Sequence, residues 1–305
     1  MLKGLAITPP VIGRISIGRV VERNGKRLPE KDVQFTLTSQ VQTRDGWVLH
    51  PLDEALRKQA EGHKLRSLPV RLLFNDPTLN LRADYCLFDR TTGRPMCVGN
   101  GDTCRRTGKD GIESQTCPGP QACAYAAGDC KAYARLNVVV GDGEGDALGS
   151  FVLRTTSYNT IRTLAARLDY FHAVSGGRLA CLPLELKLRG KSTTMSYRVA
   201  IYYVDLVVRT GLSLEQALLQ AHETDEQRRA CRFDQLALDE AARRGFGNGA
   251  FEELEEDVPA VVEEFFPEGE TDPAPAVPAP GEALRGKLEA KVAQGSTGRT
   301  ARPAH

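Results

Sequence analysis

The chain has 305 residues, 41% of them apolar, and its 40 Lys and Arg residues nearly balance its 39 Asp and Glu residues, for a net charge of +1. This length and apolar content suffice for a buried core without crosslinks, which excludes the class of small secreted domains stapled by disulfides. The N-terminal apolar run is broken by Pro9, Pro10 and Arg14, and no stretch approaches about 18 apolar residues, so the sequence predicts a cytoplasmic protein without a signal peptide or a membrane-spanning helix.

The first half of the chain predicts a β-sheet. Short segments rich in Val, Ile, Leu and Phe are separated by turn residues such as Asn24-Gly25, which is the pattern of strands joined by tight turns. One helix is expected from about Pro51 to Glu61. The glycine-rich stretch 141–149 is expected to be a hairpin connection between the strands that flank it. The expected strands are 14–21, 33–41, 68–74, 81–89, 133–140 and 150–157.

The second half predicts two principal helices and two further strands. Helical spacing of apolar residues predicts a helix over 159–174, with one face made by Ile161, Leu164, Ala165, Leu168 and Phe171. Strands are expected at 180–190 and 196–208, and the long apolar run of the second favours a central place in the sheet. Ser213 and Gln216 have the spacing of a capping box, which starts a helix expected to reach about Arg244. The sequence thus predicts an α+β fold with a mainly antiparallel sheet.

Four of the eight cysteines fall within one Gly- and Pro-rich segment. Their spacing is Cys104-x12-Cys117-x5-Cys123-x6-Cys130, and few apolar side chains lie between them. Ordering such a segment costs about 1 to 2 kcal/mol per residue, which no core of its own repays. A structural Zn²⁺ ion held by four thiolates would supply the missing free energy. We therefore expect a zinc-stapled loop with four cysteine ligands at about 97–131.

Other interpretations of the cysteines remain open. The spacing lacks paired C-x-x-C motifs, so Cys97 or Cys86 is a candidate to replace one of the four ligands. An iron–sulfur cluster and plain buried thiols are the alternatives to zinc. Arg105, Arg106 and Lys131 lie next to the cysteines and would offset the negative charge of a zinc–thiolate centre.

The C-terminal part of the chain is acidic. From Gly245 onwards there are 12 acidic and 5 basic residues, so residues 1–244 carry 35 basic and 27 acidic residues, a surplus of +8. We expect an α+β domain at 1–244, an acidic segment at 245–266 and a disordered Pro/Ala-rich tail at 267–305. The acidic segment is either an amphipathic ligand for a basic or grooved partner or a solubilising tail. Its apolar residues are Val261, Val262, Phe265 and Phe266.

A metal-dependent nuclease is an alternative function. Glu185 and Lys187 form an E-x-K pair on a predicted strand, with Asp169 upstream, and nucleases use such groups to hold Mg²⁺ and polarise the attacking water. The charged residues of this strand also alternate with leucines, which is the pattern of a strand with one face in water.

Three segments carry a resemblance to a known family. They are "FVLRTTSYNTIRTLAARL" (151–168), "LACLPLELKL" (179–188) and the cysteine block before them. Over about residues 2–209 the chain resembles the recombination directionality factor-like family of phages and integrative elements, some of whose members are labelled "hydrolase or metal-binding protein". The resemblance implies a non-enzymatic accessory protein that binds a DNA recombinase, a large serine integrase in characterised relatives, and shifts it from integration towards excision.

That role implies a protein partner already bound to DNA, with only indirect or weak DNA contact by this chain. The candidate contact residues are Arg105, Arg106 and Lys109 on the cysteine loop, and Arg162 and Arg167 on the predicted helix. These charges would also suit a solvated helix face. A zinc-stabilised nucleic-acid-binding module that uses the +8 surplus is the third functional candidate.

Overall fold

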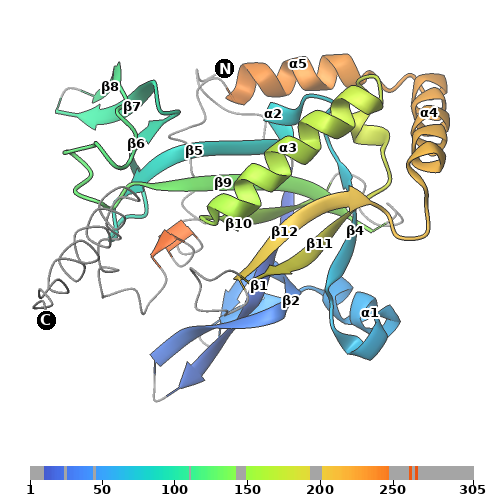
Figure 1. Cartoon of the computed structure of the whole chain (residues 1–305), viewed down its shortest axis with the longest axis horizontal. Coiled ribbons are helices and arrows are strands. Elements are labelled where there is room, and N and C mark those ends of the chain that lie inside the picture. The colour runs from blue at the N-terminus through green and yellow to red at the C-terminus, as the bar shows by residue number, and fades with distance from the viewer. Residues whose placement is uncertain are drawn as a thin grey trace, which may run out of the picture. The chain divides into compact units, whose positions relative to one another are not determined.

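The computed structural model describes residues 10–23, 26–43, 46–109, 111–141, 149–192, 201–246, 261–262 and 265–266. Within these residues the chain forms one sheet of 12 strands and five α-helices (Figure 1). The strands are β1 (Val11–Arg23), β2 (Lys26–Thr43), β3 (Gly46–Leu49), β4 (Ser67–Leu72), β5 (Leu81–Phe88), β6 (Pro95–Gly99), β7 (Thr103–Gly108), β8 (Gly111–Thr116), β9 (Lys131–Val140), β10 (Ser150–Thr155), β11 (Leu184–Lys191) and β12 (Ile201–Val208). The helices are α1 (Pro51–Gln59), α2 (Pro77–Asn80), α3 (Tyr158–Val174), α4 (Leu214–Ala230) and α5 (Gln235–Phe246).

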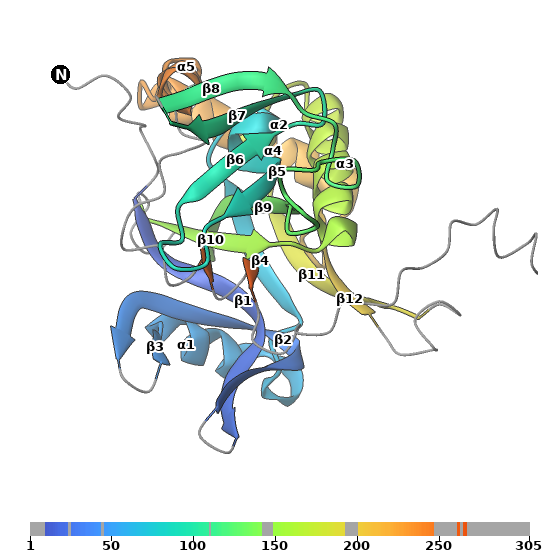
Figure 2. The same ribbon diagram turned by 90° about the vertical axis from the view of Figure 1, so that its left-hand side faces the viewer.

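The sheet follows the order β3-β2-β1-β10-β9-β5-β6-β7-β8, and a branch of β4, β11 and β12 leaves it at β9. Among the strand pairs of the described residues only β1 and β10 run parallel, so the fold is α+β with a mainly antiparallel sheet. Figure 2 shows β6, β7 and β8 at the opposite end of the sheet from β1, β2 and β3. The sheet therefore has two distinct ends, and the cysteine-rich segment forms one of them.

The expected loop at 97–131 is more regular than its sequence indicates. It contains the end of β6 and the antiparallel hairpin of β7 and β8, which the sequence did not predict. Neither hairpin strand shows apolar alternation, because every side chain of β8 is exposed and β7 buries only Cys104. The expected strand 133–140 is confirmed as β9, which begins two residues earlier, at Lys131, directly after Cys130.

The expectation of a central strand at 196–208 is wrong. In the described residues β12 pairs only with β11, which places it at an edge. Its residues Val204 and Leu206 are nevertheless buried, because α3 packs against it and the N–H of Val204 donates a hydrogen bond to Thr160 Oγ1 at 3.2 Å. A covering helix, not a second neighbouring strand, explains the apolar run.

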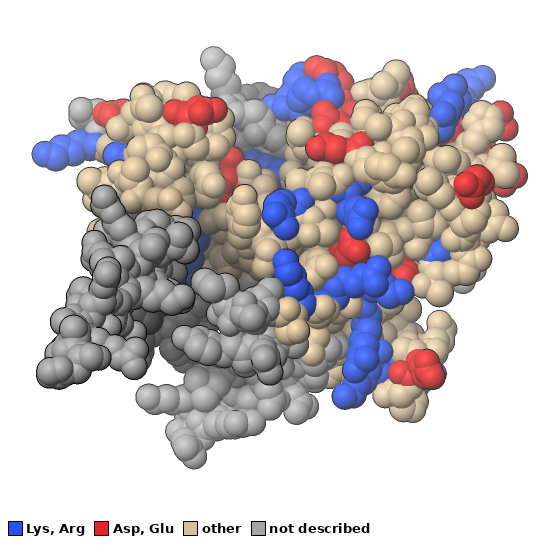
Figure 3. Space-filling model, in the orientation of Figure 1, with Lys and Arg blue, Asp and Glu red and all other residues tan. Residues whose placement is uncertain are grey.

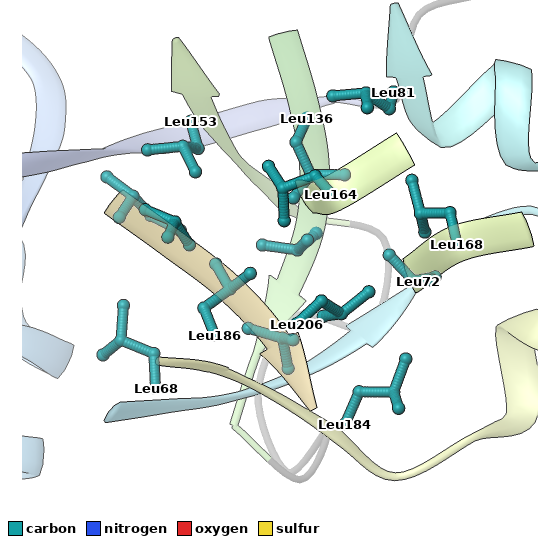
Figure 4. Close-up of a cluster of buried hydrophobic side chains, with 14 of the residues drawn as sticks. Leu68, Leu72, Leu81, Leu136, Leu153, Leu164, Leu168, Leu184, Leu186 and Leu206 are labelled. Carbon is teal, nitrogen blue, oxygen red and sulfur yellow. The ribbon is translucent and has the colours of Figure 1, made fainter. Parts of the chain in front are cut away.

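Helix α3 packs on the sheet through the face that its sequence predicts, except that Ala165 is exposed. Its N-terminus is capped by Ser157, whose Oγ accepts from the N–H of Thr160 at 3.4 Å. Leu164 and Leu168 point into the main core together with leucines of the sheet, such as Leu136 and Leu186 (Figure 4). This packing fixes the position of the helix and leaves its other face in solvent.

The predicted helix from Ser213 to about Arg244 is two helices, so the expectation of two principal helices is wrong. Its start is confirmed, because the N–H of Ser213 donates to Gln216 Oε1 and the N–H of Gln216 donates to Ser213 Oγ. The helix ends because Arg232 adopts a left-handed φ of 59°, which a helix cannot continue. Asp234 then caps α5 by accepting from the N–H of Ala237.

The Pro/Ala-rich tail predicted at 267–305 lies outside the described residues, as does most of the acidic segment after Phe246. All the described residues lie in one compact unit. No helix in the described part of the chain is both long enough and apolar enough to cross a membrane.

Removal of a core contact between α3 and the sheet should destabilise the whole fold. Leu164 is fully buried in the main core, so Leu164→Ala is expected to lower the free energy of unfolding by about 2 to 5 kcal/mol. Leu219→Ala is the matched control on α4, because Leu219 is 64% exposed and should change stability by less than about 0.5 kcal/mol. Urea unfolding measures both, and equal losses would show that α3 does not cover the core as described.

Candidate functional site

The four predicted cysteine ligands come together, and Cys97 joins them. Cys97 lies on β6 and Cys104 on β7, whereas Cys117, Cys123 and Cys130 lie in the segment from the end of β8 to the start of β9. Cys97, Cys104 and Cys117 belong to one buried cluster with Leu87 and Ala126, and the half-buried Cys123 and Cys130 pack against it. We call these five side chains the thiol cluster. Cys86 is not a member, because it belongs to a different cluster.

The thiol cluster depends on a glycine opposite Cys104. Gly99 pairs with Cys104 across β6 and β7. A Cβ atom at position 99 would lie 2.6 Å from the Cβ of Cys104, which is closer than real Cβ atoms approach, and in a tight contact of 3.0 Å with the Sγ of Cys117. Only glycine lets the strand and both thiols come this close.

The thiols interact electrostatically with one another. Burial raises the pKa of Cys104 to about 11, and hydrogen bonding to Cys97 and the charge of Cys97 add to the shift. The pKa of Cys130 is likewise raised to about 11. Burial is the largest cause, and the negative charges of the other thiolates add to it, in the order Cys123, Cys97, Cys117 and Cys104. Without a bound cation, these two groups are therefore neutral thiols near pH 7.

The half-buried Arg106 side chain packs against the thiol cluster and does not project into solvent. Its guanidinium lies 3.9 Å from the ring centroid of Tyr125, and its Nη2 lies 3.9 Å from the Sγ of Cys123. This positive group beside sulfur would stabilise thiolates. Of the three residues predicted here as partner contacts, Lys109 is exposed at the hairpin turn, whereas Arg105 and Arg106 are half-buried.

All eight cysteines lie in the described part of the chain, and none of them forms a disulfide there. Among the described residues, no group of three or more His, Cys, Asp and Glu side chains has the geometry of a metal site. Zinc is therefore not shown, and both the ion and its four ligands remain predictions.

Arg162 and Arg167 lie on a basic face made by α3, β11 and β12. Figure 3 shows Lys and Arg side chains gathered on this side of the molecule. Arg167 and Arg189 both donate through Nε to Asp205, at 3.0 and 3.3 Å, and each is 46% exposed. The buried carboxylate of Asp205 thus orients two guanidinium groups that reach solvent. Sequence reasoning missed Asp205, although a single charge inside the apolar run of β12 was the available signal.

Glu185 is buried and hydrogen-bonded as a structural group. Its carboxylate accepts from the N–H and Oγ1 of Thr210, at 3.1 and 2.8 Å, and from Lys187 Nζ at 3.3 Å. Burial by itself would raise the pKa of Glu185, but hydrogen bonds from Thr210, Ser67 and Lys187 outweigh burial and lower it. Asp169, the other acidic group of the predicted nuclease site, is exposed on α3. These contacts give Glu185 a role in the fold.

A hollow of about 1040 Å³ at the junction of α2, α3, α4 and α5 holds none of the predicted site residues. Three of its arginines form ion pairs with its acidic groups. Arg178 bonds to Asp225 at 3.1 Å, and Arg243 bonds to Asp76 at 3.0 Å. These pairs hold the helices together.

The chain matches the family model described as "Gp3-like: Recombination directionality factor-like" over residues 12–209. The match runs from β1 to the residue after β12, so it contains the thiol cluster and the basic face but neither α4 nor α5. No curated protein and no solved structure matches the chain.

The contacts of Glu185 predict a loss of stability in Glu185→Gln. A neutral amide cannot accept all three hydrogen bonds, so the free energy of unfolding should fall by about 1 to 3 kcal/mol near pH 7. The pKa is lower in the folded chain than its ordinary 4.5, so this contribution is present above about pH 4.5 and is lost as the pH falls below it.

Urea unfolding across pH measures the difference between Glu185→Gln and the wild type, with the exposed Glu226→Gln on α4 as the control. Unchanged stability, together with a Mg²⁺-dependent nuclease activity that Glu185→Gln removes, would favour a catalytic role instead.

Proposed function

The chain belongs to the recombination directionality factor-like family, and from this membership we propose that it is a non-enzymatic accessory factor that binds a DNA recombinase and sets the balance between integration and excision. The observation that carries the proposal is the family match over 12–209, which contains most of the sheet and α3. The partner in this proposal is a large serine integrase bound to its DNA, in the cytoplasm.

Such a factor acts by population shift. A recombinase on DNA exchanges between arrangements that integrate and arrangements that excise, and a protein that binds one arrangement more tightly increases its population. A tenfold preference corresponds to about 1.4 kcal/mol. The accessory protein therefore needs a well-formed contact surface and no active site.

The basic face is the surface that we assign to the recombinase. Asp205 holds Arg167 and Arg189 in place, so less side-chain entropy is lost when a partner binds them. Tyr158 and Tyr170 are exposed on the same helix as Arg162 and Arg167. Tyr and Arg are the residues that most often dominate binding at protein interfaces. Asp205 also reduces the positive charge of the face, which suits a protein contact better than a dedicated phosphate-binding surface.

Zinc is the second part of the proposal. We propose that Cys104, Cys117, Cys123 and Cys130 hold one structural Zn²⁺ ion and that Cys97 is a buried neighbour. The support is that these thiols lie in one cluster with a guanidinium beside them, and that Cys123 and Cys130 line a surface hollow through which an ion would enter. A bound Zn²⁺ ion would keep four sulfurs deprotonated and crosslink the hairpin of β7 and β8 to the start of β9.

The recombinase proposal predicts a contact defect from α3. Arg162→Glu combined with Arg167→Ala should weaken binding to a serine integrase from the same mobile element by about tenfold or more, and should reduce the shift towards excision. Lys58→Glu on α1 is the control, because Lys58 is also exposed to solvent but lies outside the basic face.

Co-purification with the integrase and an excision assay measure the effect, after melting curves show that both variants fold. The wild-type chain failing to bind the integrase, or the double variant binding as well as the wild type, would contradict the proposal. Tight binding to DNA alone, weakened steeply by salt, would favour the nucleic-acid-binding module.

The zinc proposal predicts one Zn²⁺ ion per chain by elemental analysis. Cys104→Ser or Cys130→Ser should lose the ion and lower the melting temperature, whereas Cys97→Ser and the exposed Cys231→Ser should retain it. Removal of the ion by a chelator should lower the melting temperature of the wild type in the same way. Absence of zinc from freshly purified protein, or serine variants that melt like the wild type, would refute the proposed site.

A further inference from the structure

The strands β5 and β6 bury apolar side chains on both of their faces. Leu87 and Cys97 lie in the buried cluster around the thiols, whereas their neighbours Phe88 and Val98 belong to a second cluster with Cys86. Successive residues of a strand point to opposite faces, so the two clusters lie on opposite sides of the same pair of strands. The segment 117–130 covers one side of the strands, and another part of the chain must cover the other side.

The cover is formed by the described residues of the C-terminal acidic segment. Val261 and Phe265 are fully buried in the second cluster, which also contains Tyr133 of β9. The ring of Phe265 meets the ring of Phe88 edge to face, with centroids 4.9 Å apart and an angle of 72°. The N–H of Phe266 donates to the carbonyl of Val262 at 2.8 Å, as in a turn of helix. Figure 1 draws these residues in orange near the β5–β9 part of the sheet.

We call Val261, Val262, Phe265 and Phe266 the tail anchor. Two basic residues of the body contact it. Lys131 Nζ donates to the carbonyl of Phe265 at 3.5 Å, and the Arg90 guanidinium lies 4.6 Å from the ring centroid of Phe266. The anchor comes from a stretch with nine carboxylates between Glu252 and Glu270, so the charges of ligand and receptor are complementary.

We propose that Phe88, Val98, Tyr133, Lys131 and Arg90 form a binding site for a short acidic helix, and that the tail anchor is its resident ligand, which leaves while the sheet stays folded. The ligand pattern is an apolar residue followed four positions later by Phe, among carboxylates. Fourteen residues separate Phe246 from Val261, so the anchor acts as a tethered ligand at high effective concentration. A partner segment with the same pattern would compete with it.

Two equally buried cysteines can show whether the tail anchor dissociates while the main core stays folded. Cys86 lies in the second cluster and Cys181 in the main core, and each is 4% exposed. In the full chain, Phe265→Ala should raise the rate at which a maleimide labels Cys86 by about tenfold or more and leave Cys181 unchanged, because local opening exposes only the residues under the anchor. Mass spectrometry of the digested protein measures both rates.

A labelled peptide of residues 255–270 tests the site directly. It should bind full-length Phe265→Ala about tenfold or more tightly than the wild type, whose own anchor competes with it, and the same peptide carrying Phe265→Ala should bind neither. Cys86 and Cys181 labelling faster together would show that the anchor is part of the core, which overturns the proposal. Unchanged Cys86 labelling, or equal peptide affinity for both chains, would also overturn it.

Discussion

The convergence of five thiols at one end of the sheet is the constraint on which the rest of the structure depends. Burial and interactions among the thiols raise the pKa of Cys104 and Cys130 even with Arg106 nearby, so these sulfurs stay protonated near neutral pH unless a bound metal ion stabilises their thiolates. The hairpin of β7 and β8 has little apolar surface to hold it in place. A metal ion would meet both requirements, because it stabilises thiolates and crosslinks the hairpin to β9.

The strands β5 and β6 connect this constraint to the remainder of the molecule. One of their faces holds Cys97, and the other holds Phe88 and Val98 under the tail anchor. A change in the packing of the thiol cluster would therefore also alter the binding site of the tail anchor, because the same two strands form both. The basic face is built separately, on α3, β11 and β12, where Asp205 positions Arg167 and Arg189. The proposed partner contact and the proposed metal site therefore lie on different elements of the fold.

Much of the fold could be predicted from the sequence because it follows local patterns. The apolar face of α3 and the capping box at Ser213 depend on residues a few positions apart. The elements that the sequence analysis predicted wrongly or missed depend on tertiary contacts. Because α3 covers β12, this edge strand has the long apolar run that is typical of a central strand. The strands β7 and β8 pair although neither shows apolar alternation. The proximity of the cysteines was predictable from spacing, whereas the inclusion of Cys97 and exclusion of Cys86 required the strand register. The burial of Phe265 against Phe88 joins residues too distant for any local pattern to reveal.

X-ray absorption at the zinc edge of the full-length protein tests the proposed centre most directly. A tetrahedral site of four thiolates predicts a single shell of four sulfur atoms at about 2.3 Å from the ion. That result would show how a polar hairpin with almost no core of its own stays folded at the end of the sheet. A shell dominated by nitrogen or oxygen, or no zinc edge at all, would contradict it, and the five thiols would then be an ordinary part of the packing.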